Sequence, residues 1–355
     1  MSDSMNNAKK NIMVIATGGT IAGAGEQGKD IGYKSGSIKA QALIDAIPEL
    51  NDVANIRVEQ FCNINSDDIT SEIWISLALR IKELSKQEDV DGFVIMHGTD
   101  TMEETAFFLS LVLGADASGV AKPVVLTGSM RPATAAEPDG PANLLFAVKC
   151  AVEQSLRRPE RAEGAAGSVI TVYVAFAGKL MNARTLQKIH ANDLDAFAEV
   201  DGSPAACHPG LSSRLQCHPG LSSRTPFRDH LLALAFDISA LHSLPKVSVL
   251  YFNADADAEL VRFAAERSAG LVIAGAGAGE FSQAWAKSIA DVIAQSNVPV
   301  VVSSRINRGC IVPEQLLVPG TIAAYGLPPA KAAVLLRLAL TVTNNVAEIQ
   351  KFFNE

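Results

Sequence analysis

Runs of β-branched and other apolar residues alternate with amphipathic stretches of helical length along most of this chain. Strand-like runs occur at Ile12–Ala16, Gly92–Met96 and Pro123–Thr127, and an apolar stripe of helical spacing covers Ile73–Leu84 between the first two. Strands separated by helices of this length usually pair in parallel within one helix-covered sheet. The sequence therefore predicts an α/β protein built on a parallel sheet.

The same alternation starts again after about Leu244, which predicts a second α/β unit. Its predicted strands are Val247–Tyr251, Leu271–Ala274 and Val298–Ser303. We therefore expect an N-terminal α/β domain over residues 1–200, an inter-domain linker over residues 201–245 and a smaller C-terminal α/β domain over residues 246–355. A chain of 355 residues is long enough for two such domains.

Composition and charge exclude several classes of protein. Hydrophobic residues make up 48% of the chain and charged residues 19%, which is ordinary for a globular protein. The net charge of −8 argues against nucleic acid as a partner, and no apolar run is long enough to cross a membrane. The polar N-terminus contains no signal peptide, so we expect a cytoplasmic protein, or a periplasmic one if the sequence is a mature form.

The octapeptide CHPGLSSR occurs twice in the predicted linker, at Cys207–Arg214 and at Cys217–Arg224. Its Cys-His pairs invite comparison with zinc ligands, but their spacing differs from that of structural zinc sites. Pro and Gly in each copy favour an irregular surface segment, so we expect a duplicated linker and no metal site. The five cysteines are few, odd in number and scattered, which is not the pattern of a disulfide framework.

Hydroxyl and carboxylate side chains follow three predicted strands of the first domain. The segment TGGT (residues 17–20) follows the first strand, HGTD (97–100) the second and GS (128–129) the third. Because ligands bind beyond the carboxyl ends of strands in an open α/β sheet, these segments are predicted to line one site. Glycine permits close approach of a ligand there. With no Ser-His-Asp set and no GxSxG elbow evident, the residues leave open a threonine-based amide or ester hydrolase.

Other interpretations of the glycines are weaker. A phosphate loop requires Lys-Ser/Thr after the glycines, and a dinucleotide site requires GxGxxG; the TGGT segment has neither. The run AGAGAGE (Ala274–Glu280) matches a dinucleotide loop better, although glycine-rich strand exits are common. Taken alone, a threonine at a strand exit is more often a helix N-cap or part of a turn.

Two longer segments resemble the signatures of a known family. VIATGGTIAG (Val14–Gly23) and VIMHGTDTM (Val94–Met102) resemble those of the bacterial L-asparaginases, above all the type II enzymes and their glutaminase-asparaginase relatives. Lys122–Leu145 and Leu335–Glu355 resemble the same family, and the likeness breaks between roughly Asp201 and Pro245. Two long signatures in family order, each at a strand end, make this resemblance specific.

The resemblance implies a cofactor-independent hydrolase that converts L-asparagine to L-aspartate and ammonia, with secondary activity on L-glutamine. It also implies a homotetramer in which a neighbouring C-terminal domain completes each active site. Two alternatives from other classes are a non-catalytic amino-acid-binding protein and a dinucleotide-binding oxidoreductase. Release of ammonia from asparagine separates the first alternative from the hydrolase, and protection by NAD would reveal the second.

The resemblance also assigns catalytic residues. Thr20 matches the nucleophilic threonine, and Tyr33 matches a tyrosine that assists it from a mobile lid, here residues 24–36. Thr99, Asp100 and Lys188 match a second polar triad. Taken singly, Tyr33 would be an ordinary loop residue, Lys188 a solvated surface lysine and Asp100 a helix cap.

Substrate-binding residues follow from the same comparison. Ser66 matches the serine that holds the substrate α-carboxylate, and Thr99 and Asp100 lie where the α-ammonium group would bind. Asp67 replaces the usual Gln or Glu and would place a second carboxylate beside that ammonium group. The alternative is that Asp67 caps a helix that begins near Ile69.

The contribution expected from a neighbouring subunit is less regular. Ala278 stands where many family members carry an asparagine, and Glu280 or Ser282 is positioned to replace it. Glu314 is the nearest candidate for the carboxylate that reaches across a dimer. His97 has no expected catalytic role and is predicted to be a packed, hydrogen-bonded histidine.

Overall fold

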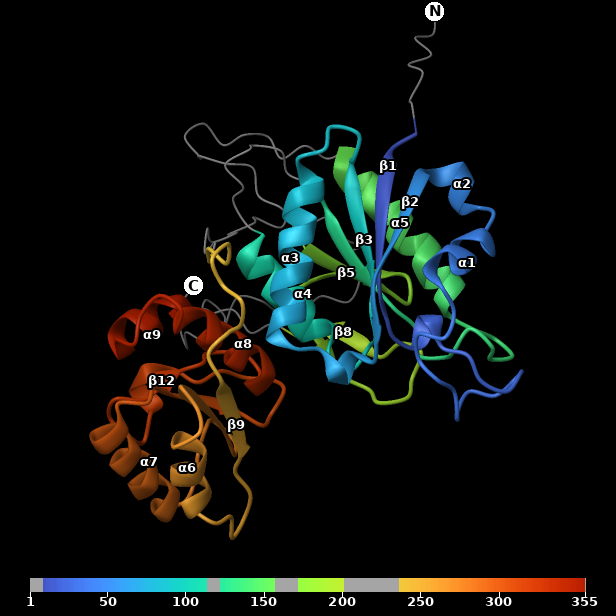
Figure 1. The fold of residues 1–355 in the computed structure, drawn as a ribbon. Coiled ribbons are helices and arrows are strands. Elements are labelled where there is room, and N and C mark those ends of the chain that lie inside the picture. Colours follow the sequence, from blue (N-terminus) through green and yellow to red (C-terminus); the bar gives the residue numbers. More distant parts are fainter. Residues whose placement is uncertain (1–8, 114–121, 157–171, 201–235, 355) are drawn as a thin grey trace, which may run out of the picture. The chain divides into compact units, whose positions relative to one another are not determined.

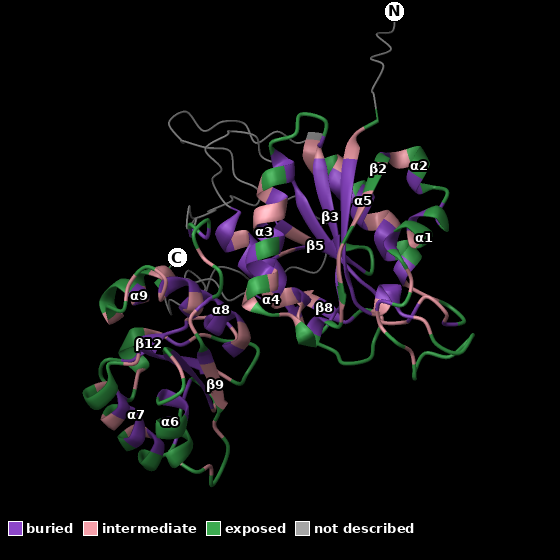
Figure 2. Ribbon diagram, in the orientation of Figure 1, coloured by how far each residue is buried: buried purple, intermediate pink, exposed green. Residues whose placement is uncertain are grey.

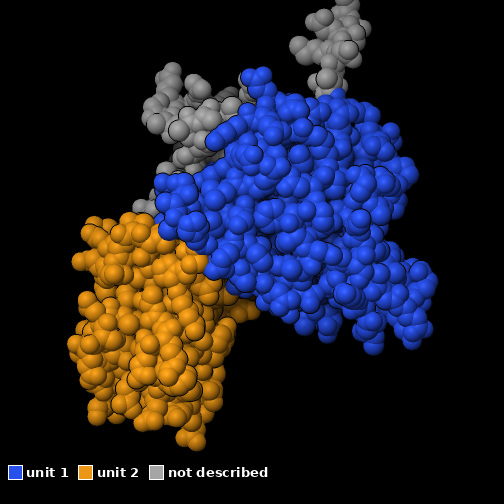
Figure 3. Space-filling model, in the orientation of Figure 1, with its two compact units in different colours: residues 1–199, 235–242 blue, residues 200–234, 243–355 orange. Residues whose placement is uncertain are grey.

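The computed structural model describes residues 9–113, 122–156, 172–200 and 236–354 (Figure 1). The chain divides into two compact units, shown in different colours in Figure 3. The first contains the described residues through 199 together with 236–242, and the second contains residue 200 and residues 243–354. Residues 236–242 of the predicted linker thus pack with the first unit, and both copies of CHPGLSSR lie outside the described residues.

The first unit is built around a six-stranded sheet with the strand order β2-β1-β3-β4-β5-β6. Neighbouring strands from β2 to β5 pair in parallel, and β6 is an antiparallel strand at the edge. The α/β prediction is therefore confirmed, with one antiparallel strand that the sequence did not indicate. The strands are β1 (Asn11–Gly18), β2 (Asn55–Ile64), β3 (Gly92–Met96), β4 (Val124–Thr127), β5 (Val172–Phe176) and β6 (Lys179–Asn182).

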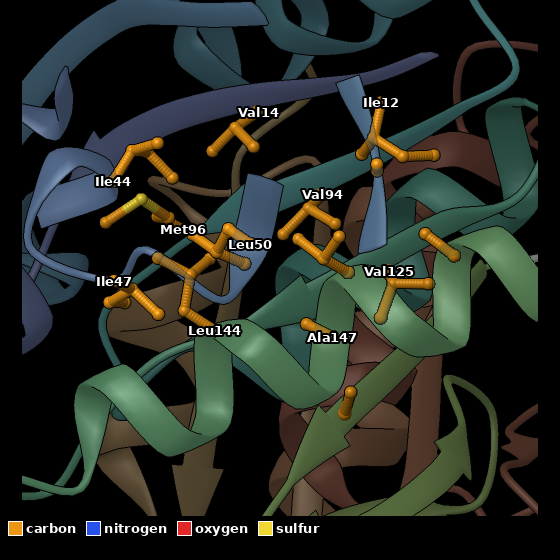
Figure 4. Packing of buried hydrophobic residues seen from close by; sticks show 14 of the residues in the cluster. Ile12, Val14, Ile44, Ile47, Leu50, Val94, Met96, Val125, Leu144 and Ala147 are labelled. Carbon is orange, nitrogen blue, oxygen red and sulfur yellow. The ribbon is translucent and has the colours of Figure 1, made fainter. Parts of the chain in front are cut away.

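Helices cover both faces of this sheet (Figures 1 and 2). On one face, Ile12, Val14 and Ala16 of β1 pack with residues of α1, α2 and α5, as Figure 4 shows from close by. Because successive side chains of a strand point to opposite faces, Met13 and Ile15 face the other side, where α3 and α4 lie. The helices are α1 (Ala40–Asp45), α2 (Leu50–Val53), α3 (Ser71–Ser85), α4 (Met102–Val112) and α5 (Gly140–Leu156).

A short antiparallel pair, β7 (Leu186–Lys188) and β8 (Phe197–Glu199), follows the main sheet. Phe197 packs edge-on against Phe176 of β5, with 5.0 Å between the ring centroids. This contact fixes the pair to the sheet and so determines where Lys188 lies.

The second unit is a parallel four-stranded sheet with the order β12-β11-β10-β9, as the alternation after Leu244 predicts. Its core includes the fully buried Trp285, whose indole N–H donates to the carbonyl of Ala256. The elements are β9 (Val247–Tyr251), α6 (Glu259–Ala265), β10 (Gly270–Gly275), α7 (Gln283–Ser296), β11 (Val300–Ser304), β12 (Ile322–Ala323), α8 (Pro329–Ala339) and α9 (Val346–Asn354).

The glycine-rich run after β10 folds back on itself. Ala276 and Glu280 exchange two backbone hydrogen bonds of 2.8 and 2.7 Å. A Cβ atom at Gly275 would lie 2.4 Å from the backbone of Gly279, so glycine is needed for the turn itself. This closed turn accounts for the glycines without a dinucleotide.

Three of the five cysteines, Cys62, Cys150 and Cys310, lie among the described residues. Cys62 and Cys150 are free, and burial raises the pKa of both thiols to about 11. Cys310 is disulfide-bonded. Among the described helices, none has both the length and the apolar character needed to cross a membrane.

His97, directly after β3, is fully buried and hydrogen-bonded at both ring nitrogens, as predicted. Nδ1 lies 2.7 Å from the carbonyl oxygen of Gly98, to which it must donate, and Nε2 lies 3.0 Å from the Thr105 hydroxyl. The same hydroxyl accepts a hydrogen bond from the indole of Trp74 at 2.8 Å. With His97 neutral, every side-chain polar atom of His97, Thr105 and Trp74 has a hydrogen-bond partner. Burial lowers the pKa of His97 from 6.5 to about 4.

The depressed pKa of His97 predicts a pH-dependent stability. The unfolded chain binds a proton at this histidine that the folded chain excludes, so the contribution is complete above pH 6.5 and is lost towards pH 4. We expect the free energy of unfolding to fall by as much as about 3 kcal/mol across this window. Chemical denaturation of the wild type and His97→Gln at pH 7, 6 and 5 tests this. Equal pH dependence in the two proteins would contradict the assignment.

Candidate active site

The carboxyl ends of β1 and β3 meet at the point where the strand order reverses, with β2 on one side of β1 and β3 on the other. This is where ligands bind in open α/β sheets. Gly18 and Gly19 have φ of +115° and +82°, values that favour glycine. A Cβ atom at Gly19 would lie 2.5 Å from Cα of Gly98, so the two strand exits are in backbone contact. That contact brings the segments ending in Thr20 and Thr99 together.

Thr20 begins a short 3-10 helix, Thr20–Ala22, directly after the two glycines. Its Oγ1 lies 2.9 Å from the hydroxyl of Tyr33, and both residues are half-buried. Tyr33 belongs to the predicted lid, which folds as a hairpin through two backbone hydrogen bonds between Ala24 and Lys34. The structure therefore brings together the predicted nucleophile and the predicted lid tyrosine.

Thr99, Asp100 and Lys188 form a second group at the exit of β3. The ammonium group of Lys188 donates to Oγ1 of Thr99 at 3.0 Å and to Oδ1 of Asp100 at 2.6 Å. The Lys188 side chain is 15% exposed and the Asp100 side chain 69% exposed, so the pair runs from the interior to the surface. Lys188 is thus not a solvated surface lysine.

A third segment, the 3-10 helix Ser66–Asp68, approaches the same place. Ser66 is buried, and a Cβ atom at Gly98 would lie 2.7 Å from its Oγ. The hydroxyl of Thr101 donates to the Ser66 carbonyl at 2.6 Å. The cap of α3 is Thr70, whose hydroxyl accepts from the amide of Ile73, so the alternative that Asp67 caps this helix is wrong.

These segments surround a cavity of about 610 Å³. Three carboxylates, Asp67, Asp68 and Asp100, and one ammonium group, that of Lys34, belong to its lining, which suits a small ligand that carries a positive charge. Thr99 and Lys188 are outside the lining and reach the cavity through Asp100. The lining residues are Gly19, Thr20, Tyr33, Lys34, Ser35, Asn63, Ile64, Asn65, Ser66, Asp67, Asp68, Gly98 and Asp100.

The residues expected to act across a subunit interface lie in the second unit. Glu280 is exposed in the closed turn after β10, and Glu314 is exposed in the 3-10 helix Pro313–Gln315. Ser282 is the N-cap of α7, where its hydroxyl accepts from the amide of Trp285.

Two residues were missed by the sequence analysis. Glu103 accepts a 2.7 Å hydrogen bond from the backbone amide of Lys188 and ties β7 to the first turn of α4. Acidic residues are common at the start of a helix because they stabilise the helix dipole, so Glu103 was not singled out from the sequence. Asn63 lines the cavity and donates to the carbonyl of Gly36 at the end of the lid. It lies in β2, a strand that was not predicted.

The arrangement supplies the parts of nucleophilic catalysis. Within the described ranges, no three His, Cys, Asp or Glu side chains are grouped so as to hold a metal. Two hydroxyl groups are each within hydrogen-bonding distance of a partner that can exchange a proton, a phenol for Thr20 and an amine for Thr99.

Both halves of the chain match models of one protein family. Residues 11–216 match the family model Asparaginase, N-terminal, and residues 246–353 match the Glutaminase/Asparaginase C-terminal domain. L-asparaginase 2 of Bacillus subtilis is 38% identical over 97% of this chain and 86% of its own length. Glutaminase-asparaginase of Pseudomonas fluorescens is 34% identical over 97% of this chain and 90% of its own length.

A solved structure gives the same result. The crystal structure of a probable cytoplasmic L-asparaginase from Campylobacter jejuni superimposes with a TM-score of 0.78 at 36% identity, covering 97% of this chain and 99% of that one. Both halves of the chain thus match the same kind of enzyme, over nearly their whole length. The chain belongs to the asparaginase family of amidohydrolases.

Proposed function

We propose that the protein hydrolyses L-asparagine to L-aspartate and ammonia through a covalent ester on Thr20, without a cofactor. The observation that carries this proposal is the pairing of two hydroxyl groups with proton-exchanging partners at strand exits that are in backbone contact. The names of the related enzymes support asparagine as the substrate.

Thr20 is the better placed of the two hydroxyls for attack on the substrate. Thr20 lines the cavity, whereas Thr99 does not. As the Thr20 oxygen bonds to the amide carbon, its proton passes to the phenol oxygen of Tyr33, which lies 2.9 Å away, while the Tyr33 hydroxyl gives its own proton to the amide nitrogen and the phenol stays neutral. The C–N bond then breaks, ammonia leaves with a proton, and water hydrolyses the ester to release aspartate and restore Thr20.

The Thr99–Asp100–Lys188 group serves proton transfer at the same site. The Lys188 amine lies 3.0 Å from the Thr99 hydroxyl, a distance over which the two groups can exchange a proton. Asp100 holds the lysine at 2.6 Å and extends the group to the cavity wall. The backbone bond from Lys188 to Glu103 fixes the strand that carries the lysine.

Substrate recognition is assigned to the acidic wall and to Ser66. Asp67, Asp100 and Ser66 all line the cavity, and in this proposal the two aspartates bind the α-ammonium group of an amino acid while Ser66 binds its α-carboxylate. The aspartate at position 67 is one methylene shorter than a glutamate. The names of the related enzymes, L-asparaginase 2 and glutaminase-asparaginase, lead us to expect asparagine as the better substrate and glutamine as a secondary one.

The proposal includes a homotetramer. Glu280 and Glu314 are exposed acidic residues of the second unit. We assign both residues to the site of a neighbouring subunit. Glu280 takes the role of the asparagine that many family members carry at the position of Ala278. Sedimentation velocity at the assay concentration tests this part of the proposal, and an active monomer would contradict it.

A coupled ammonia assay with asparagine, glutamine and no substrate tests the function directly. Thr20→Ala should lose several orders of magnitude in kcat while still binding substrate, because only the attacking oxygen is removed. Thr17→Ala is a matched control, since the Thr17 hydroxyl donates to the Met96 carbonyl and lies outside the cavity lining. Turnover near that of the wild type in Thr20→Ala would exclude Thr20 as nucleophile, and asparagine binding without ammonia release would indicate a binding protein.

Removal of the Lys188 amine should abolish turnover without unfolding the protein. Lys188→Met keeps the aliphatic bulk of the side chain and removes the group that contacts Thr99. Lys179→Met is the control, because Lys179 also pairs with an aspartate, Asp195, but its side chain is 48% exposed. Comparable activity in the two variants would show that Lys188 is structural only.

Asp67→Asn should raise KM for asparagine by about tenfold, with little change in stability. A charge-assisted hydrogen bond contributes about 1.5–3 kcal/mol, and the exposure of Asp67 places it at the lower end. Asp52→Asn makes the same charge change on the exposed surface of α2 and should leave KM unaltered. An unchanged KM in Asp67→Asn would remove this residue from the binding site.

A further inference from the structure

The lid hairpin rests on the segment that follows β4, residues 131–135. Thr134 makes two hydrogen bonds to the lid: its hydroxyl oxygen accepts from the amide of Gly25 at 3.0 Å, and its carbonyl accepts from the amide of Gly28 at 2.8 Å. The neighbouring amide of Ala133 donates to the carbonyl of Gly23 at 3.0 Å. Two hydrogen bonds, both to Thr134, and the 3.6 Å ion pair between Arg131 and Asp30 therefore join the lid to this segment, and a third hydrogen bond joins Gly23, directly before the lid, to Ala133.

This segment is itself fixed to the sheet. The Asp139 carboxylate accepts from the backbone amides of Met130 and Arg131, each at 2.9 Å. Asn143, in the first turn of α5, donates to that carboxylate at 3.1 Å and to the carbonyl of Gly128 at 3.0 Å. Asn143 is buried, so these bonds hold the start of the segment against α5 away from solvent.

Two further contacts connect the hydrogen bond between Thr134 and Gly25 to the reacting groups. A Cβ atom at Gly25 would lie 2.9 Å from Cα of Tyr33, so the two arms of the hairpin are in contact at this point. The hydroxyl of Tyr33 in turn contacts Oγ1 of Thr20. Displacement of Gly25 from Thr134 would thus move Tyr33 relative to Thr20.

We propose that Thr134 is a positioning residue for the reaction: it docks the lid on the segment after β4 and thereby holds Tyr33 against Thr20. Thr134 does not line the cavity and has no direct contact with the reacting atoms. The proposal rests on the proposed function for its kinetic consequence, but the docking of the lid can be measured without turnover.

Trypsin cleavage after Lys34 reports lid opening. Both backbone polar groups of Lys34 are bonded to Ala24 in the docked hairpin, so cleavage requires the hairpin to open. In Thr134→Val, which keeps the β-branched shape and removes the acceptor, we expect cleavage to be about fivefold faster, the effect of one lost hydrogen bond. Thr134→Ser retains the acceptor and should be cleaved at the wild-type rate. Thr341→Val is the control: it makes the same substitution in the second unit, where the Thr341 hydroxyl donates to the carbonyl of Leu338.

A kinetic cycle separates positioning from a general loss of structure. Thr134→Val should lower kcat in the wild-type background by up to about fivefold and have no further effect in Tyr33→Phe, because Thr134 acts through the Tyr33 hydroxyl. Wild-type cleavage in Thr134→Val would overturn the proposal, as would an equal fall of kcat in both backgrounds. If Thr134→Val fails to fold, Thr134→Ala replaces it with the same expected outcomes. If the wild-type protein releases no ammonia, the proposed function fails while the cleavage rates still decide the docking role.

Discussion

The active-site region depends on the contact between two glycines at neighbouring strand exits. Any side chain at Gly19 would place a carbon atom within 2.5 Å of the Gly98 backbone, and any side chain at Gly98 would collide with Ser66. Because these glycines carry no side chain, the segments after β1, after β3 and after β2 converge on one cavity. Thr20, Thr99 and Ser66 owe their proximity to this close packing of backbone, not to direct contacts between their side chains.

The polar groups around this contact divide into a rigid interior and an exposed wall. His97, fully buried and neutral, fills the space behind Gly98 with every hydrogen bond satisfied. Asp100 and Asp67 lie on the exposed side, where a cationic substrate group can reach them. Lys188 connects the two zones. A fixed interior with exposed charges suits a site that must orient a small amino acid precisely.

Much of the fold and the pairing of site residues could be predicted from the sequence. The strongly apolar strands β1, β3 and β4 carry a clear signal because both of their faces are buried. Strand β2 was missed because it lies at the sheet edge, is only partly buried and contains several polar residues. Consequently Asn63 was missed too. The assignment of Thr20, Tyr33 and Lys188 came from resemblance to a family, since no local pattern places a lid tyrosine or a distant lysine beside a threonine.

Long-range backbone contacts explain the remaining omissions. The docking of Gly25 and Gly28 on Thr134 spans more than a hundred residues and involves backbone amides, which leave no trace in the choice of side chain at the glycines. The hydrogen bond from the Lys188 amide to Glu103 is of the same kind. Such contacts depend on how the sheet brings loops together, and only the folded chain reveals them.

The central claim is that Thr20, set at the meeting point of β1 and β3, forms the covalent bond with substrate. Rapid acid quenching of the enzyme during turnover of asparagine, followed by peptide mass spectrometry, tests it most directly. The account predicts that the peptide containing Thr20 gains the mass of one aspartyl group, and that the peptide containing Thr99 does not. An aspartyl adduct on Thr99 would contradict this mechanism. So would the absence of an adduct on Thr20 both in the active wild type and in Lys188→Met mixed with asparagine.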